Sequence, residues 1–216
     1  MPGMSQRVAG FGTTMFVEIN ALARAHGAVN LGQGAPDFHG PPEVLRAAVA
    51  AVNSALNQYP PGVGMPAVRA AIAAHADRFY RHKVDREAEV LVTSGATEAV
   101  FAAILGLTDA GDEVIVFEPV YDSYVPNMVM AGVTPRYVPL RGDTWTFDPG
   151  ELARAFGPRT RAIIVNTPHN PTGKVYSPEE LSCIAALCQE HDVVAVTDEV
   201  YEHILYDGAA HTRLAT

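Results

Sequence analysis

Two asparagines, Asn166 and Asn170, follow the apolar run Ile163–Val165 and carry amide side chains that can donate and accept hydrogen bonds. The run predicts a short buried strand, and the prolines and glycine around Asn170 predict a turn. Ligands of open α/β sheets bind outside the carboxyl ends of the strands, so both amides stand where a ligand could bind. Asparagines also shape turns, and that alternative stays open for this pair.

Asp198 and Tyr201 follow a second apolar run, Val193–Thr197. Such a run is typical of a parallel strand that is buried on both faces. A carboxylate at the end of a buried strand must be paired or solvated. Asp198 could therefore cap a local backbone group, pair with an arginine, or pair with a cationic ligand.

Small residues mark a third position, where the predicted strand Glu89–Thr93 turns through Gly95 into a predicted helix from about Ala96 to Leu107. Backbone N–H groups at a helix start, together with the helix dipole, can bind an anion, and the Thr97 hydroxyl could add a donor. Plain capping of the helix is the alternative.

Three sequence strings carry these residues. They read Thr-Ser-Gly-Ala-Thr-Glu-Ala from Thr93, Asn-Thr-Pro-His-Asn-Pro-Thr-Gly from Asn166 and Thr-Asp-Glu-Val-Tyr-Glu from Thr197. With these strings in family order, the chain from about Phe11 onward resembles the pyridoxal-phosphate-dependent aminotransferases of class I/II, fold type I. A fourth string, Asn-Leu-Gly-Gln-Gly-Ala-Pro-Asp-Phe from Asn30, makes it look most like the methionine, kynurenine and glutamine aminotransferases.

The resemblance implies pyridoxal 5'-phosphate as the cofactor. It implies that Gly95, Ala96 and Thr97 hold the phosphate and that Tyr121 lies over the face of the pyridine ring. A flat aromatic side chain suits that position because offset stacking holds the ring plane. Without the resemblance, Tyr121 would be interpreted as a packing aromatic.

The resemblance also implies catalytic roles for Asp198 and Tyr201. The Asp198 carboxylate would pair with the protonated pyridine nitrogen and keep the ring an effective electron sink. Tyr201 and Asn170 would both bind the phenolic oxygen of the ring, and Asn170 would also lie beside the substrate.

Two further positions are implied outside these strings. Gly34 would approach the substrate carboxylate, where a residue without a side chain lets the backbone come close; a mere turn is the alternative. Tyr59 would reach across a dimer interface to the cofactor phosphate of the partner subunit, so a homodimer is expected. An ordinary loop aromatic is the alternative for Tyr59.

The chain has two lysines, Lys83 and Lys174, and neither matches the lysine that holds the cofactor as a Schiff base in the family. We expect that lysine, flanked by serine, about 30–40 residues after Asp198, judged from family spacing and cofactor chemistry. The carboxylate-binding arginine of the family is expected beyond Thr216 as well. The chain thus looks like the N-terminal part of a longer subunit and is expected to be inactive by itself.

Bulk composition excludes several classes of protein. The 216 residues carry a formal net charge of −9, which argues against a nucleic-acid partner. We expect no membrane span, because no apolar run approaches about 18 residues, and no metal site. The two cysteines, Cys183 and Cys188, are expected to be free thiols of a reducing compartment, which favours a cytoplasmic enzyme.

Predicted strands and helices alternate along the chain, which favours an α/β fold with a mostly parallel sheet. With the resemblance, this becomes a three-layer α/β/α large domain of fold type I, incomplete at its C-terminus. Residues 1–45 are expected to form an N-terminal arm and part of a small domain, and residues 46–216 the large cofactor-binding domain. Five strands are expected, beginning with Glu89–Thr93 and ending with Val193–Thr197.

Three functions follow as hypotheses. The first is an amino-acid aminotransferase, which moves an amino group between an amino acid and a 2-oxo acid through pyridoxal phosphate. The second is a carbon–sulfur β-lyase that uses the same cofactor residues. The third is a non-catalytic module for cofactor binding or dimerisation.

Overall fold

The computed structural model describes residues 3–34 and 36–215. They form two compact units: one comprises Met1–Gly10 and Pro66–Thr216, and the other comprises Phe11–Met65. The larger unit contains the sheet and every residue that lines the pocket described below.

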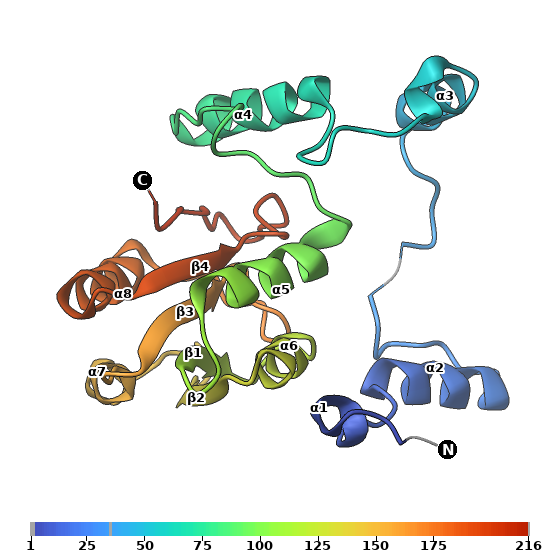
Figure 1. Ribbon diagram of the computed structural model, residues 1–216. Coiled ribbons are helices and arrows are strands. Elements are labelled where there is room, and N and C mark those ends of the chain that lie inside the picture. The colour runs from blue at the N-terminus through green and yellow to red at the C-terminus, as the bar shows by residue number, and fades with distance from the viewer. Residues whose placement is uncertain (1–2, 35, 216) are drawn as a thin grey trace. The chain divides into compact units, whose positions relative to one another are not determined.

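A four-stranded sheet forms the centre of the larger unit (Figure 1). Its strands are β1 (Glu113–Glu118), β2 (Thr134–Pro139), β3 (Thr160–Asn166) and β4 (Val194–Asp198), in the spatial order β2-β1-β3-β4. All neighbouring pairs are parallel. The carboxyl ends of the strands therefore meet at one edge of the sheet, which is where open α/β sheets bind ligands.

One face of the sheet is covered by α7 (Pro149–Ala155) and α8 (Pro178–His191). Ile115 of β1 points to this face and belongs to one buried cluster with Leu152 and Ile184 of the two helices. All three side chains are fully buried, and each such burial stabilises the fold by about 1.5–3 kcal/mol.

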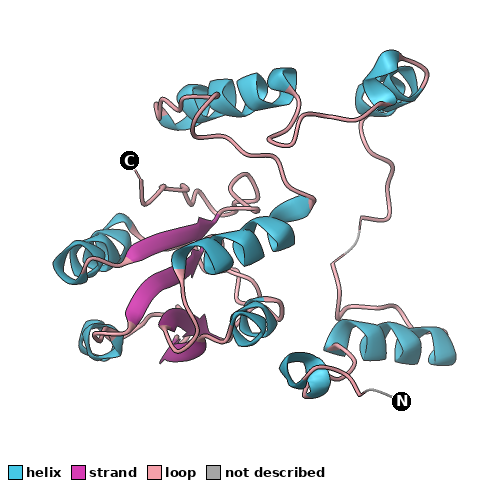
Figure 2. Cartoon of the chain, in the orientation of Figure 1, coloured by secondary structure: helices cyan, strands magenta, loops and turns pink. Residues whose placement is uncertain are grey.

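The opposite face is covered by α5 (Gly95–Leu107) and α6 (Tyr124–Ala131). Val114, the neighbour of Ile115 in β1, points this way because successive strand residues face opposite sides. It forms a second buried cluster with Ile104 of α5 and Met128 of α6. The predicted three-layer α/β/α arrangement with a parallel sheet is confirmed, and Figure 2 shows helices on both sides of the strands.

The start of α8 has a capping box. The Ser177 hydroxyl accepts a hydrogen bond from the Glu180 N–H at 3.2 Å, and the Glu180 carboxylate accepts one from the Ser177 N–H at 2.9 Å. Pro178 occupies the first helical position, where its missing N–H removes no hydrogen bond. This cap fixes where the chain leaves the β3 turn and begins to cross back over the sheet.

The expected strand Glu89–Thr93 is wrong. The segment is irregular, and the Glu89 N–H donates to the Asp85 carbonyl at 2.8 Å in a turn. A strand requires a hydrogen-bonded neighbour, and the structure pairs β4 only with β3 within the described residues. The Leu91 side chain is accordingly 59% exposed.

Two helices of the larger unit were not expected from the sequence. They are α1 (Gln6–Ala9) and α6, and α6 contains a proline that weakens its helical pattern. The helix before the irregular segment is α4 (Pro66–Tyr80).

The smaller unit contains α2 (Met15–His26), α3 (Pro42–Val52) and the 3-10 helix Ala55–Asn57. Asn20 and Asn30 are joined by a side-chain hydrogen bond of 2.5 Å, which ties α2 to the glycine-rich segment that follows it. None of the helices in the described part of the chain is long and apolar enough to cross a membrane.

Candidate cofactor site

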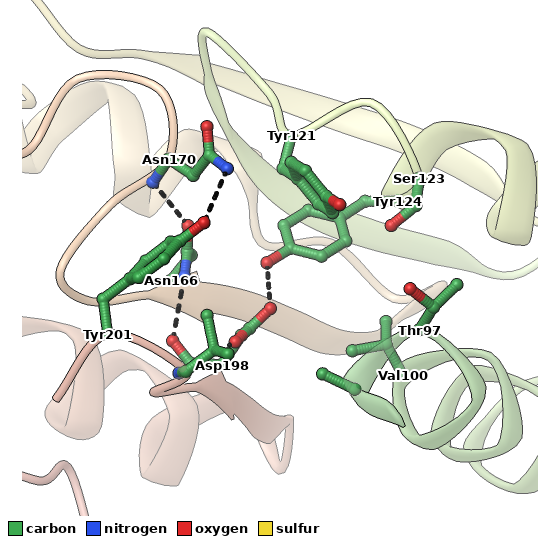
Figure 3. A pocket seen from close by; sticks show the side chains of 11 residues that line it. Thr97, Val100, Tyr121, Ser123, Tyr124, Asn166, Asn170, Asp198 and Tyr201 are labelled. Atoms are coloured by element: carbon green, nitrogen blue, oxygen red, sulfur yellow. Dashed lines mark hydrogen bonds between the residues drawn. The ribbon is translucent and has the colours of Figure 1, made fainter. Parts of the chain in front are cut away.

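A pocket lies at the carboxyl edge of the sheet, where β1, β3 and β4 end and α5 begins (Figure 3). Four separate stretches of the sequence supply its wall. The lining residues are Ala96, Thr97, Val100, Tyr121, Ser123, Tyr124, Asn166, Asn170, Asp198, Val200 and Tyr201.

Asp198 is the last residue of β4 and faces this pocket. Its Oδ2 accepts a hydrogen bond of 2.6 Å from the Tyr124 phenol, and its Oδ1 accepts one of 3.2 Å from the Val200 N–H. The observed partners are thus a phenol and a backbone amide rather than an arginine. A carboxylate that is held in this way can still receive a cationic group from the pocket side.

Tyr124 is the first residue of α6 and is only 4% exposed. Burial, followed by the charge and the hydrogen bond of Asp198, raises the pKa of its phenol. The phenol therefore stays protonated at neutral pH and can act only as a donor toward the carboxylate. Tyr124 thus lines the pocket and orients Asp198.

Asn166 shapes the turn after β3, which was the alternative to ligand binding given for the asparagine pair. Its Oδ1 accepts a 2.6 Å hydrogen bond from the Asn170 N–H, and its Nδ2 donates to the Asp198 carbonyl at 3.0 Å. The side chain is 3% exposed. It ties the turn after β3 to the end of β4 and so sets the positions of Asn170 and Asp198.

Asn170 faces the pocket beside Tyr201. Its Nδ2 lies 3.3 Å from the Tyr201 phenol oxygen, within hydrogen-bond distance, and Figure 3 shows the two side chains meeting above Asn166. Together they present an amide and a phenol that could both donate to a single oxygen atom of a ligand.

Tyr121 provides an aromatic wall at the end of β1. Its ring packs edge-to-face against Tyr124, with centroids 5.5 Å apart and an interplanar angle of 72°. Burial raises the pKa of its phenol, and the neighbouring Asp122 adds to the shift. The neutral ring lines the pocket and could stack on a flat ligand.

The start of α5 lines the pocket through Ala96 and Thr97. Gly95 comes directly before them with φ of 83°, a conformation that favours glycine. The Ser94 N–H donates to the Glu98 carboxylate, but the Ser94 side chain makes no cap hydrogen bond to the helix. The Gly95 N–H donates to the Thr93 carbonyl at 2.9 Å. The Ala96 and Thr97 amides follow in the first turn of α5, where a helix offers no intrahelical acceptor, and they could bind an anion together with the dipole.

Two predicted residues lie in the other compact unit. Gly34 and Tyr59 belong to Phe11–Met65, and the Tyr59 side chain is 98% exposed. The pocket lining does not include them, nor does it include Gly95. Their roles stay predictions.

Neither lysine lines the pocket. The Lys174 ammonium forms an ion pair with Glu180 at 2.8 Å, lies over the Tyr176 ring and has a side chain that is 5% exposed. Lys83 is exposed, in the loop after α4.

Sequence reasoning missed the Tyr124–Asp198 bond and the presence of Ser123 in the lining. The two partners of the bond are 74 residues apart, so no local pattern relates them. The bond could have been predicted only if α6 had been predicted to start at Tyr124, at the carboxyl edge of the sheet.

The fold and the pocket together define a class of protein. The family model for aminotransferase class I and II matches residues 26–215, and the chain belongs to this family. Members of the family with fold type I depend on pyridoxal phosphate, and the donor set of the pocket fits that group: an aromatic wall, a carboxylate, an amide–phenol pair and a helix start.

Individual relatives are close in sequence. The chain is 51% identical over 211 residues to the probable N-succinyldiaminopimelate aminotransferase DapC of Mycobacterium tuberculosis, covering 97% of this chain and 53% of that protein. It is 44% identical to kynurenine–oxoglutarate transaminase 3 of Bos taurus, covering 98% of this chain and 49% of that protein. The chain therefore spans about half the length of the curated relatives that it matches.

Solved structures agree. The N-succinyldiaminopimelate aminotransferase of Mycobacterium tuberculosis superposes with a TM-score of 0.94 at 51% identity, covering 99% of this chain and 56% of that one. YbdL of Escherichia coli, a structure described with a methionine aminotransferase function, superposes with a TM-score of 0.93 at 38% identity over the same shares. These likenesses support the predicted resemblance to the family.

Proposed function

We propose that the natural protein is a pyridoxal-phosphate-dependent amino-acid aminotransferase, which moves an amino group between an amino acid and a 2-oxo acid. The observation that carries the proposal is the convergence of Thr97, Tyr121, Asn170, Asp198 and Tyr201 on one pocket from four stretches of sequence. Ala96 lines the same pocket. Membership of the aminotransferase class I and II family supports it.

When bound, pyridoxal phosphate supplies an aldehyde that accepts the amino group and a pyridine ring that takes up electrons. In the proposal, the Asp198 carboxylate holds a proton on the ring nitrogen. The Tyr124 phenol keeps that carboxylate oriented through its hydrogen bond to Oδ2. The remaining lone pairs of the carboxylate could then accept the ring N–H. Asp198 and Tyr201 are the proposed catalytic residues of this chain.

The remaining pocket residues bind and orient. Asn170 and Tyr201 would donate to the oxygen substituent of the ring, since their polar atoms already meet at one point. Tyr121 would stack on the ring and exclude water from one face. Gly95, Ala96 and Thr97 would hold the phosphate with the first-turn amides of α5 and the Thr97 hydroxyl.

The rest of the proposal concerns the substrate, the partner subunit, the domains and the cellular location. Gly34 and Asn170 would contact the substrate, and Tyr59 would reach the cofactor phosphate of a partner subunit in a homodimer. Residues 1–45 would form the arm and part of a small domain, and residues 46–216 the cofactor-binding domain. We place the protein in the cytoplasm, where two free cysteines are stable.

Candidate amino donors follow from the relatives. They are N-succinyldiaminopimelate, kynurenine and methionine, with 2-oxoglutarate as acceptor. The resemblance seen in the sequence adds glutamine. The test expresses the protein from its own gene and measures 2-oxo-acid-dependent amino transfer from each donor. Release of pyruvate and ammonia from cystathionine, without amino transfer, would contradict the proposal and indicate a β-lyase.

Asp198→Ala is the decisive variant in that assay. We expect turnover to fall by orders of magnitude, because an unprotonated ring takes up electrons poorly. Asp207→Ala, which removes an exposed carboxylate of the same stretch, is the matched control and should keep full activity. Near-normal activity of Asp198→Ala would refute the role of this carboxylate.

A further inference from the structure

Three metal-ligand side chains meet away from the cofactor pocket. His75 lies on α4, and Glu202 and His203 lie in the segment that follows β4. The two Nε2 atoms of the histidines are 2.8 Å apart. The Glu202 Oε1 lies 3.6 Å from the Nε2 of His75 and 3.9 Å from that of His203.

The separations between these three ligand atoms are close to those around a bound transition-metal ion. Zinc takes imidazole nitrogen at about 2.0–2.1 Å and carboxylate oxygen at about 2.0–2.2 Å, so neighbouring ligand atoms of a tetrahedral ion are about 3.3 Å apart. The three observed separations lie on both sides of that value. Small side-chain rotations would make all three atoms ligands of one ion, with a fourth position open to water.

The second oxygen of Glu202 has its own partner. Arg213 binds Oε2 at 2.9 Å, and this ion pair leaves Oε1 directed at the two imidazoles. Glu199 also pairs with Arg213, at 2.9 Å. Two carboxylates, Glu199 and Glu202, thus share the one Arg213 guanidinium, and the Glu202 Oε1 remains available to a cation.

Aromatic packing holds both imidazoles in place. The Phe79 ring lies 4.7 Å from the His75 ring and 4.8 Å from the His203 ring, measured between centroids. The side chains of His75 and Glu202 are 33% and 18% exposed, whereas that of His203 is 52% exposed. The cluster is therefore supported on one side and open to solvent on the other, so an ion could enter.

We propose that His75, Glu202 and His203 form a binding site for a divalent transition-metal ion of the Zn²⁺ class. Two imidazoles and one carboxylate are a ligand set that suits zinc, and hard ions such as Mg²⁺ prefer oxygen ligands instead. A second group, made by Glu199, Glu202 and His211, offers only one imidazole. The first group is therefore the better site.

An ion at this site would join two parts of the larger unit. Its ligands come from α4 and from the segment directly after Tyr201, which lines the cofactor pocket. A bound ion would crosslink that segment to α4 and reduce its freedom to move. The site does not depend on the proposed aminotransferase function, because none of its ligands lines the cofactor pocket.

The test titrates this chain with Zn²⁺ in a buffer that does not chelate metals, by calorimetry, and follows the melting temperature in parallel. We expect saturation at one ion per chain at micromolar Zn²⁺ and a melting temperature that rises with Zn²⁺ and returns on adding a chelator. Co²⁺ should replace Zn²⁺ and give the visible absorption of a four-coordinate site with nitrogen ligands.

His75→Ala and His203→Ala should each weaken Zn²⁺ binding at least tenfold. Alanine keeps the helix propensity of α4, and His203 is half-exposed, so both variants should keep the far-ultraviolet circular dichroism of the wild type. His39→Ala, which removes an exposed histidine outside the cluster, should bind as the wild type does. Non-saturable binding up to millimolar Zn²⁺, or unchanged affinity in both cluster variants, would overturn the proposal.

Discussion

The Tyr124 phenol donates a hydrogen bond of 2.6 Å to Oδ2 of Asp198, although the two residues are 74 positions apart in the sequence. The bond joins the start of α6 to the end of β4. Both ends lie where the strands have their carboxyl ends. The bond satisfies a carboxylate that has no arginine partner in this pocket. Tyr124 is therefore both a core residue and a positioning residue for Asp198.

Replacement of Tyr124 by phenylalanine tests this bond. The ring stays in the core, while Oδ2 of Asp198 loses its donor, so we expect the free energy of unfolding to fall by about 1–2 kcal/mol. Urea denaturation of this chain measures the change, and the m-value should stay constant. Tyr137→Phe removes an exposed phenol from β2 and should have no effect. Equal stability of Tyr124→Phe and the wild type would show that the bond contributes nothing.

Locally encoded parts of the site could be predicted from the sequence. The capping box of Ser177 and Glu180 depends on residues three apart, and the turn around Asn170 depends on its own prolines and glycine. The apolar runs before Asn166 and Asp198 predict parallel strands, and β3 and β4 are parallel. Thus each pocket-lining string could be placed at a strand end or a helix start. The predicted burial of the second run on both faces is wrong, because β4 is the last strand in the sheet order and its Val194 is 47% exposed.

Parts that depend on distant partners could not be predicted in this way. The segment Glu89–Thr93 has a strand-like composition, but strand formation needs a neighbour, and the composition alone cannot supply one. The Tyr124–Asp198 bond and the cluster of His75 with Glu202 and His203 connect residues from separate elements. Their proximity follows from the packing of helices on the sheet, which single-sequence patterns do not specify.

His169 should make the stability of the chain depend on pH. Its side chain is 5% exposed, and burial, helped by the nearby Lys174 charge, lowers its pKa from 6.5 to about 4. Between these values the unfolded chain binds a proton that the folded chain does not, so stability is fully present above about pH 6.5 and falls as the pH drops toward 4. The expected loss is on the order of 3 kcal/mol.

The measurement compares urea unfolding of the wild type and His169→Asn between pH 4 and 7. Asparagine can keep a hydrogen bond to Thr172, which lies 2.8 Å from the His169 Nδ1, but it does not titrate. We expect a smaller loss of stability for His169→Asn over this range. The control His39→Asn alters an exposed histidine and should follow the wild type. Parallel pH profiles for His169→Asn and the wild type would contradict the prediction.

Added bulk at Gly95 should weaken the binding of pyridoxal phosphate. A Cβ at Gly95 would meet no atom within 4 Å, but the φ of 83° is costly for any other residue and most costly for a β-branched one. Gly95→Val should therefore displace the first turn of α5 and lower cofactor affinity at least tenfold, more than removal of the hydroxyl in Thr97→Val. Fluorescence titration of this chain with the cofactor measures both effects.

Gly106→Ala is the matched control for Gly95. Gly106 lies in the same helix, also has no atom within 4 Å of an added Cβ, and does not have a positive φ. The substitution should leave cofactor affinity unchanged and could raise stability by about 0.5–1 kcal/mol. If Gly95→Val bound the cofactor as tightly as Gly106→Ala, the start of α5 would not be the phosphate site.

Lys174 should resist labelling by pyridoxal phosphate and borohydride in the folded chain. Its ammonium is held by Glu180 at 2.8 Å, lies 4.9 Å from the centroid of the Tyr176 ring and belongs to a side chain that is 5% exposed. An amine that is buried and held by a carboxylate is not available to attack an aldehyde, because attack requires a free electron pair that can reach the carbonyl carbon. Lys83 is exposed but has none of the pocket groups beside it, so it should react slowly and without saturation.

Mass spectrometry of the labelled peptides provides the measurement. We expect no stoichiometric label on either lysine in the native chain, and label on both in urea, which shows that the chemistry works once the Lys174–Glu180 pair is broken. Glu180→Gln should raise labelling of Lys174 in the native state, because the amine then loses its only carboxylate among the ion pairs of the described residues. Stoichiometric labelling of Lys174 in the wild-type native chain would show that this lysine reaches the cofactor. It would overturn the expectation that the Schiff base is formed by a lysine after Asp198.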